Sequence, residues 1–201
     1  MIKAVVFDIG EVLLKEKNGE IEAELWKKLG RRNDKAREII LKYLNRAISR
    51  KEEDFWLEKK IAKRLDLNPN QLINLWMDLK DKYFEVNRDV EKIIAKLKKN
   101  KYTLVSLTDV NYSHEIVRRK MNVYSMFDIN LKSFELKTRK PLKKFYKVLL
   151  KRTKLKPEEI IFIDDFPLNL ETPKKMGIKA ILFIDALQLK KDLIKLGVKL
   201  K

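Results

Sequence analysis

The apolar positions of this 201-residue chain follow one pattern near its two ends and another in between. At the start, and again from about residue 84, short apolar runs alternate with longer segments whose apolar residues share one helical face. The predicted strands are residues 3–7, 102–105, 127–131, 160–163 and 180–184, and the predicted helices lie near residues 90–99, 113–121, 142–153, 168–176 and 187–196. Apolar strands that alternate with helices predict an α/β fold, a doubly wound parallel sheet of about five strands with helices on both faces.

The stretch from residue 15 to residue 83 contains no comparable strand, and its apolar residues repeat with helical spacing. Asn68 followed by Pro69 is a favourable N-cap and first-turn pair for the last of these helices. The first, second and fourth predicted helices have the apolar positions Leu25, Trp26 and Leu29; Ile39, Ile40, Tyr43, Leu44, Ala47 and Ile48; and Leu72, Leu75, Trp76 and Leu79, while the third spans residues 55–65. We therefore predict two domains, a core of residues 1–14 and 84–201 and a helical cap of residues 15–83.

The amino-acid composition excludes several classes of protein. Apolar residues make up 45% of the chain, and the absence of cysteine excludes disulfides and Cys-ligated zinc. No apolar run reaches the roughly 18 residues of a membrane span, and the chain starts with a strand rather than a signal peptide, so we expect a cytoplasmic protein with no membrane partner. Charged residues are 38% of the chain, against about 25% in ordinary domains. Such enrichment, with only two glutamines, predicts a thermophilic source.

The net charge of +18 is concentrated in one segment. Residues 132–156 contain eleven basic side chains and a single acidic one, Glu135. Such a surface attracts nucleic acid or another anionic partner. No sequence motif of a nucleic-acid-binding fold accompanies it, so we favour a solvated basic face over a nucleic-acid partner.

Polar side chains follow several of the predicted strands. Asp8 follows the first strand, Ser106 the second, and Asp164 and Asp165 the fourth, while Lys140 comes after the third. Because the carboxyl ends of parallel strands meet at one edge of a sheet, we expect these side chains to lie together. Asp8 is a candidate nucleophile, Ser106 a hydrogen-bond donor to phosphate, and Lys140 a cation that neutralises developing charge. The set predicts a phosphoryl-transfer site.

The same residues predict a magnesium site. Mg²⁺ prefers oxygen ligands in octahedral geometry and usually takes one or two protein carboxylates. Asp8, Asp164 and Asp165 supply carboxylates, and the main-chain carbonyl of Gly10 supplies a further oxygen. We therefore expect Mg²⁺ as the cofactor.

At this point the chain resembles the haloacid dehalogenase superfamily, in the branch that carries a helical cap between its first two motifs. Residues 7–14, Ser106, residues 139–141 and residues 162–177 look like its four motifs in order. The resemblance implies a Rossmann-like core, Mg²⁺ dependence and hydrolysis of phosphomonoesters. It also implies that Asp8 is both nucleophile and metal ligand, and that the remaining motif residues bind phosphate and metal as described above.

The chain departs from that family at two positions. Phosphatases of the family usually carry a second aspartate two residues after the nucleophile as the general acid, and this chain has Gly10 there. The asparagine that usually follows the second-motif hydroxyl residue, taken as Ser106, is replaced by Leu107. Loss of a general acid costs about 10²–10⁴ in rate. Glu11 and Asp109 are nearby carboxylates, and our hypothesis is that one of them substitutes.

Two functions of different classes compete. The first is a Mg²⁺-dependent phosphatase for a small phosphomonoester. The alternative is a catalytically weak or inactive relative that binds a phosphate-bearing ligand, nucleic acid or a protein partner, as Gly10, Leu107 and the basic segment suggest. Carbon–halogen hydrolysis is disfavoured, because the resemblance associates the Asp164-Asp165 pair with metal-dependent members. The oligomeric state is left unknown by the sequence.

Overall fold

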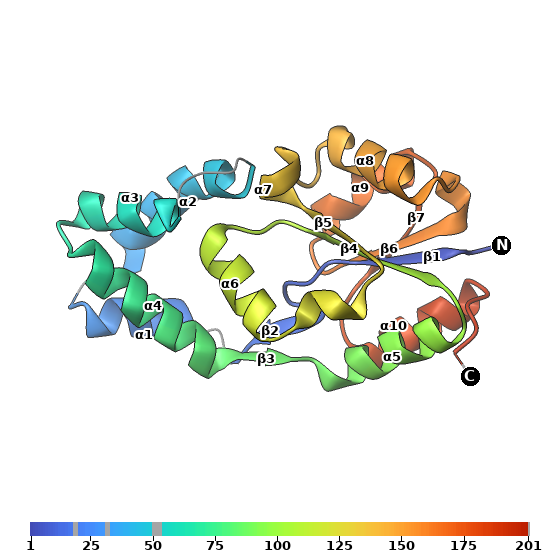
Figure 1. Ribbon diagram of the computed structural model, residues 1–201, viewed down its shortest axis with the longest axis horizontal. Helices are drawn as coiled ribbons and strands as arrows, with labels where there is room; N and C mark the ends of the chain where they lie inside the picture. The colour runs from blue at the N-terminus through green and yellow to red at the C-terminus, as the bar shows by residue number, and fades with distance from the viewer. Residues whose placement is uncertain (18–19, 31–32, 50–53, 201) are drawn as a thin grey trace.

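The computed structural model describes residues 1–17, 20–30, 33–49 and 54–200 (Figure 1). Its core is a five-stranded sheet in the order β5-β4-β1-β6-β7, in which every neighbouring pair is parallel. The strands are β1 (Ala4–Phe7), β4 (Thr103–Thr108), β5 (Ile129–Lys132), β6 (Ile160–Asp164) and β7 (Lys179–Leu182). The predicted α/β fold with a parallel sheet is confirmed.

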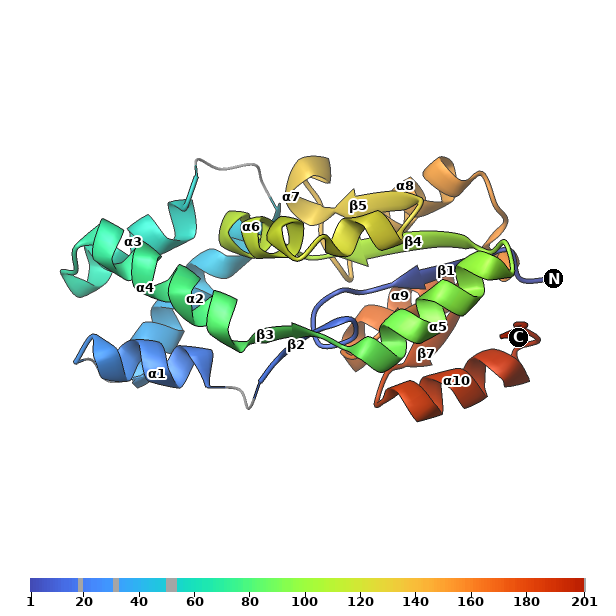
Figure 2. The ribbon, with the colours of Figure 1, turned by 60° about the horizontal axis from the view of Figure 1, so that its bottom comes forward.

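Helices cover both faces of the sheet (Figure 2). Because successive side chains of a strand point to opposite faces, Val5 and Phe7 of β1 pack into one cluster and Ala4 and Val6 into another. The first cluster includes residues of α5 (Arg88–Lys99) and α10 (Ala186–Lys195), and the second includes residues of α8 (Lys143–Thr153) and α9 (Pro167–Lys175). All four β1 residues are fully buried, which explains why the strand is apolar without alternation.

Shorter elements complete the core. They are α6 (Tyr112–Lys120), α7 (Ser133–Leu136) and two 3₁₀ turns, η1 (Val123–Met126) and η2 (Pro157–Glu159). The sequence pattern missed α7, because four residues are too few to show a helical period.

Four helices occupy the segment predicted as a cap, and they lie beyond the carboxyl ends of the strands (Figures 1 and 2). They are α1 (Ile21–Lys28), α2 (Asn33–Ser49), α3 (Trp56–Leu65) and α4 (Pro69–Tyr83). They bury their own apolar cluster, in which the rings of Trp26 and Trp76 meet edge to face at 6.1 Å. Asn68 caps α4 as predicted, since its side chain accepts hydrogen bonds from the backbone N–H groups of Asn70 and Gln71.

The expectation of no strand between residues 15 and 83 is wrong at its start. β2 (Leu14–Glu16) pairs antiparallel with β3 (Phe84–Val86), so the two chain segments that join core and cap form a ribbon. A three-residue strand carries too little alternation to be recognised, and its pairing depends on a partner some seventy residues away. No helix in the described part of the chain is both long enough and apolar enough to cross a membrane.

Candidate active site

The nucleophile candidate lies where the two central strands end. Asp8 directly follows β1, and Asp164 is the last residue of β6. The parallel register pairs Phe7 with Ile163, so the two carboxylates are neighbours across the sheet. Both are buried. Placing them together is therefore a direct consequence of strand pairing at the carboxyl edge.

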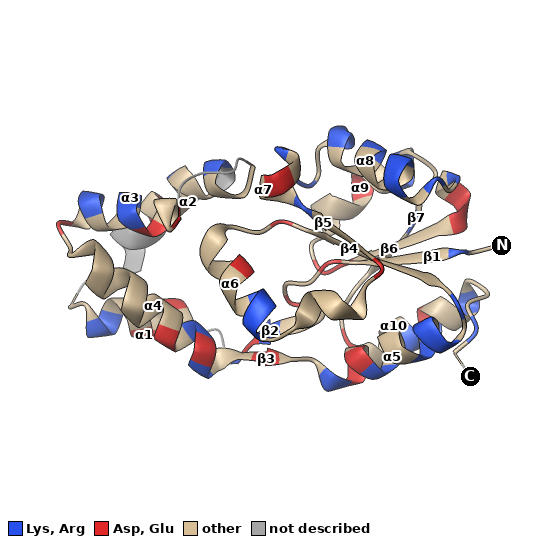
Figure 3. Ribbon diagram, in the orientation of Figure 1, with Lys and Arg blue, Asp and Glu red and all other residues tan. Residues whose placement is uncertain are grey.

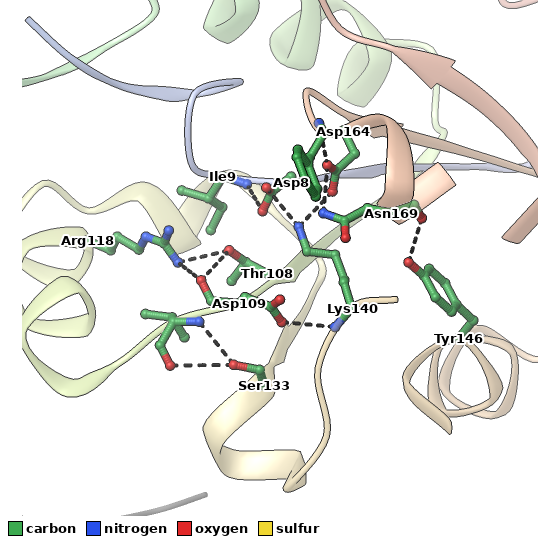
Figure 4. A network of polar contacts seen from close by, with 12 residues as sticks. Asp8, Ile9, Thr108, Asp109, Arg118, Ser133, Lys140, Tyr146, Asp164 and Asn169 are labelled. Carbon is green, nitrogen blue, oxygen red and sulfur yellow. Dashed lines mark hydrogen bonds and ion pairs between the residues drawn. The ribbon is translucent and has the colours of Figure 1, made fainter. Parts of the chain in front are cut away.

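Lys140 links these carboxylates (Figure 4). Its Nζ lies 2.8 Å from Oδ2 of Asp8 and 2.7 Å from Oδ2 of Asp164, and its side chain is almost completely buried. The second oxygen of Asp164 accepts hydrogen bonds of 2.9 Å from the Asn169 side chain and from the backbone N–H of Phe166. The carboxylate of Asp164 is thus fixed from several directions, which preorganises the site.

Asp165 completes an acidic cluster with Asp8 and Asp164. One carboxylate oxygen from each lies within 4.8 Å of the others. Lys140 compensates only one of the three negative charges, and burial makes uncompensated charge costly. A divalent cation would balance the remainder, and carboxylate oxygens are the ligands that Mg²⁺ prefers. The donor set therefore fits magnesium.

The ionisation of these groups reflects their crowding. Burial, followed by the charge of Asp8, raises the pKa of Asp164 to about 6 against the opposing effect of Lys140. Burial and the charge of Asp8 also raise the pKa of Asp165. Burial acts to lower the pKa of Lys140, but the charges of Asp8 and Asp164 outweigh it and raise that pKa. Lys140 therefore stays positively charged, and the three carboxyl groups outnumber this single cation.

The sequence analysis predicts Ser106 at the end of its strand, and the structure shows that this prediction is wrong. β4 continues through Leu107 to Thr108, and Ser106 lies opposite Phe7 in the sheet. Its buried hydroxyl donates a 2.6 Å hydrogen bond to Oδ1 of Asn130 on β5. This partner satisfies the polar side chain inside the sheet, so serine does not terminate the strand. Thr108 is the hydroxyl residue at the strand end, beside Asp8 in Figure 4.

The two possible substitute acids have different surroundings. Oδ1 of Asp109 accepts a 3.2 Å hydrogen bond from the backbone N–H of Lys140, and burial raises the pKa of Asp109 to about 6 despite that lysine's charge. Glu11 is exposed, in the left-handed region at φ 54°. Burial also raises the pKa of Glu11, and the charge of Asp8 makes a smaller contribution in the same direction for both carboxyl groups. Both are therefore close enough to interact electrostatically with the nucleophile.

Sequence reasoning missed Arg118. This residue of α6 is buried, and its Nη1 donates to Oγ1 of Thr108 at 2.9 Å and to the backbone carbonyl of Asp109 at 3.4 Å (Figure 4). A basic residue on an amphipathic helix is usually solvated, so nothing in its spacing distinguishes it from the exposed Arg119 beside it. Only the turn of α6 toward the end of β4 brings Arg118 to the site.

The cap contacts the core next to this helix. Nζ of Lys80, on α4, donates a 2.6 Å hydrogen bond to the Ser113 hydroxyl on α6, and both groups are buried. Burial, joined by the charge of Arg118, lowers the pKa of Lys80 to about 8, although Glu58 opposes the shift. A buried cation of the cap thus lies near the candidate site.

The basic segment divides into two parts. Lys140 belongs to the site, and Lys132 is buried against Glu115 with a 2.6 Å ion pair. The basic side chains of α8 are largely exposed, and the blue parts of the α8 ribbon in Figure 3 mark the positions of these residues along the helix. Part of the local charge is therefore structural rather than available to a partner.

Comparison with known proteins gives one family match and several similar proteins. The family described as haloacid dehalogenase-like hydrolase matches residues 2–177. Bifunctional epoxide hydrolase 2 of Rattus norvegicus is 32% identical over 115 residues, and this alignment spans 55% of the chain but only 21% of the rat protein. A predicted HAD-like family hydrolase from Porphyromonas gingivalis superposes with a TM-score of 0.77 at 21% identity, over 97% of this chain and 98% of that one. A HAD family enzyme from Bacteroides thetaiotaomicron, crystallised with magnesium and inorganic phosphate, gives 0.73 at 22% identity, over 94% and 99%.

Proposed function

Because the chain belongs to the family of haloacid dehalogenase-like hydrolases, we propose that it is a Mg²⁺-dependent phosphatase for a small phosphomonoester, with Asp8 as the nucleophile. The observation that carries the proposal is the position of Lys140, whose Nζ contacts both Asp8 and Asp164 beside Asp165. The Bacteroides thetaiotaomicron structure with magnesium and phosphate supports the same ligand classes.

The proposed reaction uses two displacements at phosphorus. A carboxylate oxygen of Asp8 bonds to phosphorus as the bond to the leaving oxygen breaks, and the electron pair of that bond departs with the leaving group. Water then attacks phosphorus and the bond to Asp8 breaks, which releases inorganic phosphate. Lys140 forms an ion pair with Asp8 before attack and neutralises phosphoryl charge afterward. The role proposed for Ser106 passes to Thr108, whose hydroxyl lies at the strand end.

Asp8, Asp164, Asp165 and the Gly10 carbonyl would hold the magnesium ion. When bound, Mg²⁺ supplies charge neutralisation and orientation of the phosphoryl group. The Gly10 carbonyl accepts one hydrogen bond, from the backbone N–H of Val12 at 2.7 Å, and a carbonyl oxygen has a second lone pair for a ligand.

The test is hydrolysis of p-nitrophenyl phosphate by the purified protein with and without Mg²⁺. We expect turnover with Mg²⁺ and its loss when a chelator removes the metal. A folded protein that binds Mg²⁺ but turns over none of this reactive substrate would exclude the phosphatase and favour the alternative, a relative that only binds anionic partners.

The substitute-acid hypothesis gives a separate prediction. If Glu11 or Asp109 protonates the leaving oxygen, the double variant Glu11→Gln, Asp109→Asn should lose about 10²–10⁴ of its turnover of an alkyl phosphate. The loss should be much smaller for p-nitrophenyl phosphate, because its leaving group is stable without a proton. Steady-state kinetics with both substrates measures the difference, and full alkyl phosphate turnover in the double variant would exclude both residues as the acid.

Magnesium binding should depend on pH. The metal binds ionised carboxylates, so its affinity should weaken by up to about tenfold per pH unit below the raised pKa of Asp164, about 6. In the metal-free protein, the raised pKa makes protonated Asp164 favour folding at low pH, and this contribution is lost as the pH rises through about 6. Saturating Mg²⁺ should therefore raise Tm more at about pH 7.5 than at about pH 5. Calorimetric affinities that stay constant over this range would contradict the proposed ligand set.

A further inference from the structure

Arg118 is a buried cation that forms no ion pair with any residue in the described part of the chain. Its side chain is only 5% exposed, and within the described residues no carboxylate lies within ion-pair distance of its guanidinium. Its Nη1 donates to the neutral oxygens of Thr108 and Asp109, and its Nε is buried without any hydrogen-bond partner. A buried, unpaired guanidinium is costly to maintain, which indicates that it serves a ligand.

The position of this cation points to the reacting phosphate. Thr108 ends the strand next to β1, and Arg118 holds its hydroxyl on the side of the site away from Lys140 in the view of Figure 4. The guanidinium also lies against Gly10, since a Cβ built on that glycine would be 3.6 Å from Nη2. Arg118 therefore lies beside Thr108, the last residue of β4, and beside Gly10, two residues after the candidate nucleophile.

The Arg118 guanidinium could balance negative charge that a phosphate ester brings into the site. Lys140 together with one bound divalent cation would compensate the carboxylates of Asp8, Asp164 and Asp165. A phosphomonoester brings two further negative charges near neutral pH, whereas a phosphodiester brings one. Within the described residues no nitrogen of the Arg118 guanidinium forms an ion pair, and the group offers several N–H donors in fixed geometry.

We propose that Arg118 binds an oxygen of the transferring phosphoryl group and makes the site selective for dianionic phosphate over phosphodiesters. This inference rests on the proposed phosphatase function. It assigns to α6 a substrate contact that complements Lys140. It also explains why glycine at position 10 favours substrate binding, since a carboxylate there would pair with Arg118 and reduce the positive charge available to the substrate.

The experiment compares Arg118→Gln and Arg118→Lys with wild type in the hydrolysis of p-nitrophenyl phosphate and of bis(p-nitrophenyl) phosphate. Removing a donor to developing phosphoryl charge should lower kcat/KM for the monoester by about 10²–10³ in Arg118→Gln. The diester rate should fall much less, so monoester selectivity is lost, and Arg118→Lys should recover part of it. Arg119→Gln, which removes an exposed positive charge from the same helix, is the matched control. It should change neither the monoester nor the diester kcat/KM.

A binding measurement extends the test to variants that turn over slowly. Calorimetry with inorganic phosphate and Mg²⁺ should show weaker phosphate affinity in Arg118→Gln, and also in Gly10→Asp, whose carboxylate would engage the guanidinium. Equal losses for monoester and diester, with unchanged phosphate affinity, would reduce Arg118 to a structural role and overturn the inference alone. Wild-type protein that hydrolyses no phosphomonoester would overturn the proposed function and this inference together.

Discussion

Replacing Asp8 with asparagine should abolish the Mg²⁺-dependent hydrolysis of p-nitrophenyl phosphate. The amide is nearly isosteric, but it is a poor nucleophile and carries no charge for Lys140 or for a metal ion. Removing a covalent nucleophile leaves only the contribution of binding and charge, so we expect a loss of several orders of magnitude. Initial rates measured at saturating Mg²⁺, with substrate varied, report this loss in kcat rather than in KM alone.

Asp89→Asn is a suitable control for this prediction. Asp89 lies on α5 with its side chain 71% exposed, and its ion pair with Lys92 lies on the surface. The same aspartate-to-asparagine change should leave turnover at the wild-type value, since exposed ion pairs contribute little. Residual Mg²⁺-dependent turnover of Asp8→Asn near the wild-type rate would show that another residue attacks phosphorus.

Replacing Lys140 with methionine should impair both stability and catalysis. Without its ammonium, Asp8, Asp164 and Asp165 face one another with no compensating charge in the metal-free protein. Removing one member of a buried ion pair destabilises a protein by about 3–5 kcal/mol. Because the pKa of Asp164 is already raised to about 6, this carboxyl group can take up a proton, so the destabilisation should be largest above about pH 6 and decrease below it.

The catalytic effect of Lys140→Met is expected even where the variant is fully folded. Loss of a fixed charge at the reacting group costs about 10²–10³ in kcat. Chemical denaturation at two pH values and kinetics at saturating Mg²⁺ separate the two effects, and added Mg²⁺ should restore part of the stability. Lys147→Met, an exposed position of α8, provides the matched change. A Lys140→Met protein as stable and as active as that control would refute the central role of Lys140.

The sheet and its acidic edge could be predicted because they depend on local patterns. The two central strands β1 and β6 are short apolar runs with turn or helix residues after them, and Asp8, Asp164 and Asp165 directly follow or end these runs. Their meeting then follows from parallel pairing at the carboxyl edge. Lys140 was identified by its motif context, and its approach from a loop to two carboxylates is visible only in the structure.

Other features depended on contacts distant in sequence. The sequence predicts that the strand ends before Ser106. In the structure, Asn130 on the neighbouring strand accepts a hydrogen bond from the Ser106 hydroxyl, and the strand continues to Thr108. Arg118 could not be distinguished from the exposed residues of its helix, because its burial depends on how α6 returns to the end of β4. In both cases the hydrogen-bond partner of the polar side chain lies on another secondary-structure element, so neighbouring residues in the sequence do not indicate it.

The β2–β3 ribbon makes the cap a modular insertion. The backbone N–H of Lys17 donates to the carbonyl of Tyr83 at 2.9 Å, so the chain enters and leaves the cap at adjacent points. An insertion whose ends are neighbours can change in length or be exchanged without displacing the scaffold that receives it. The carboxyl edge of the sheet and the four-helix insertion therefore have adjacent attachment points, and a change in the length of the insertion need not alter the pairing of the core strands.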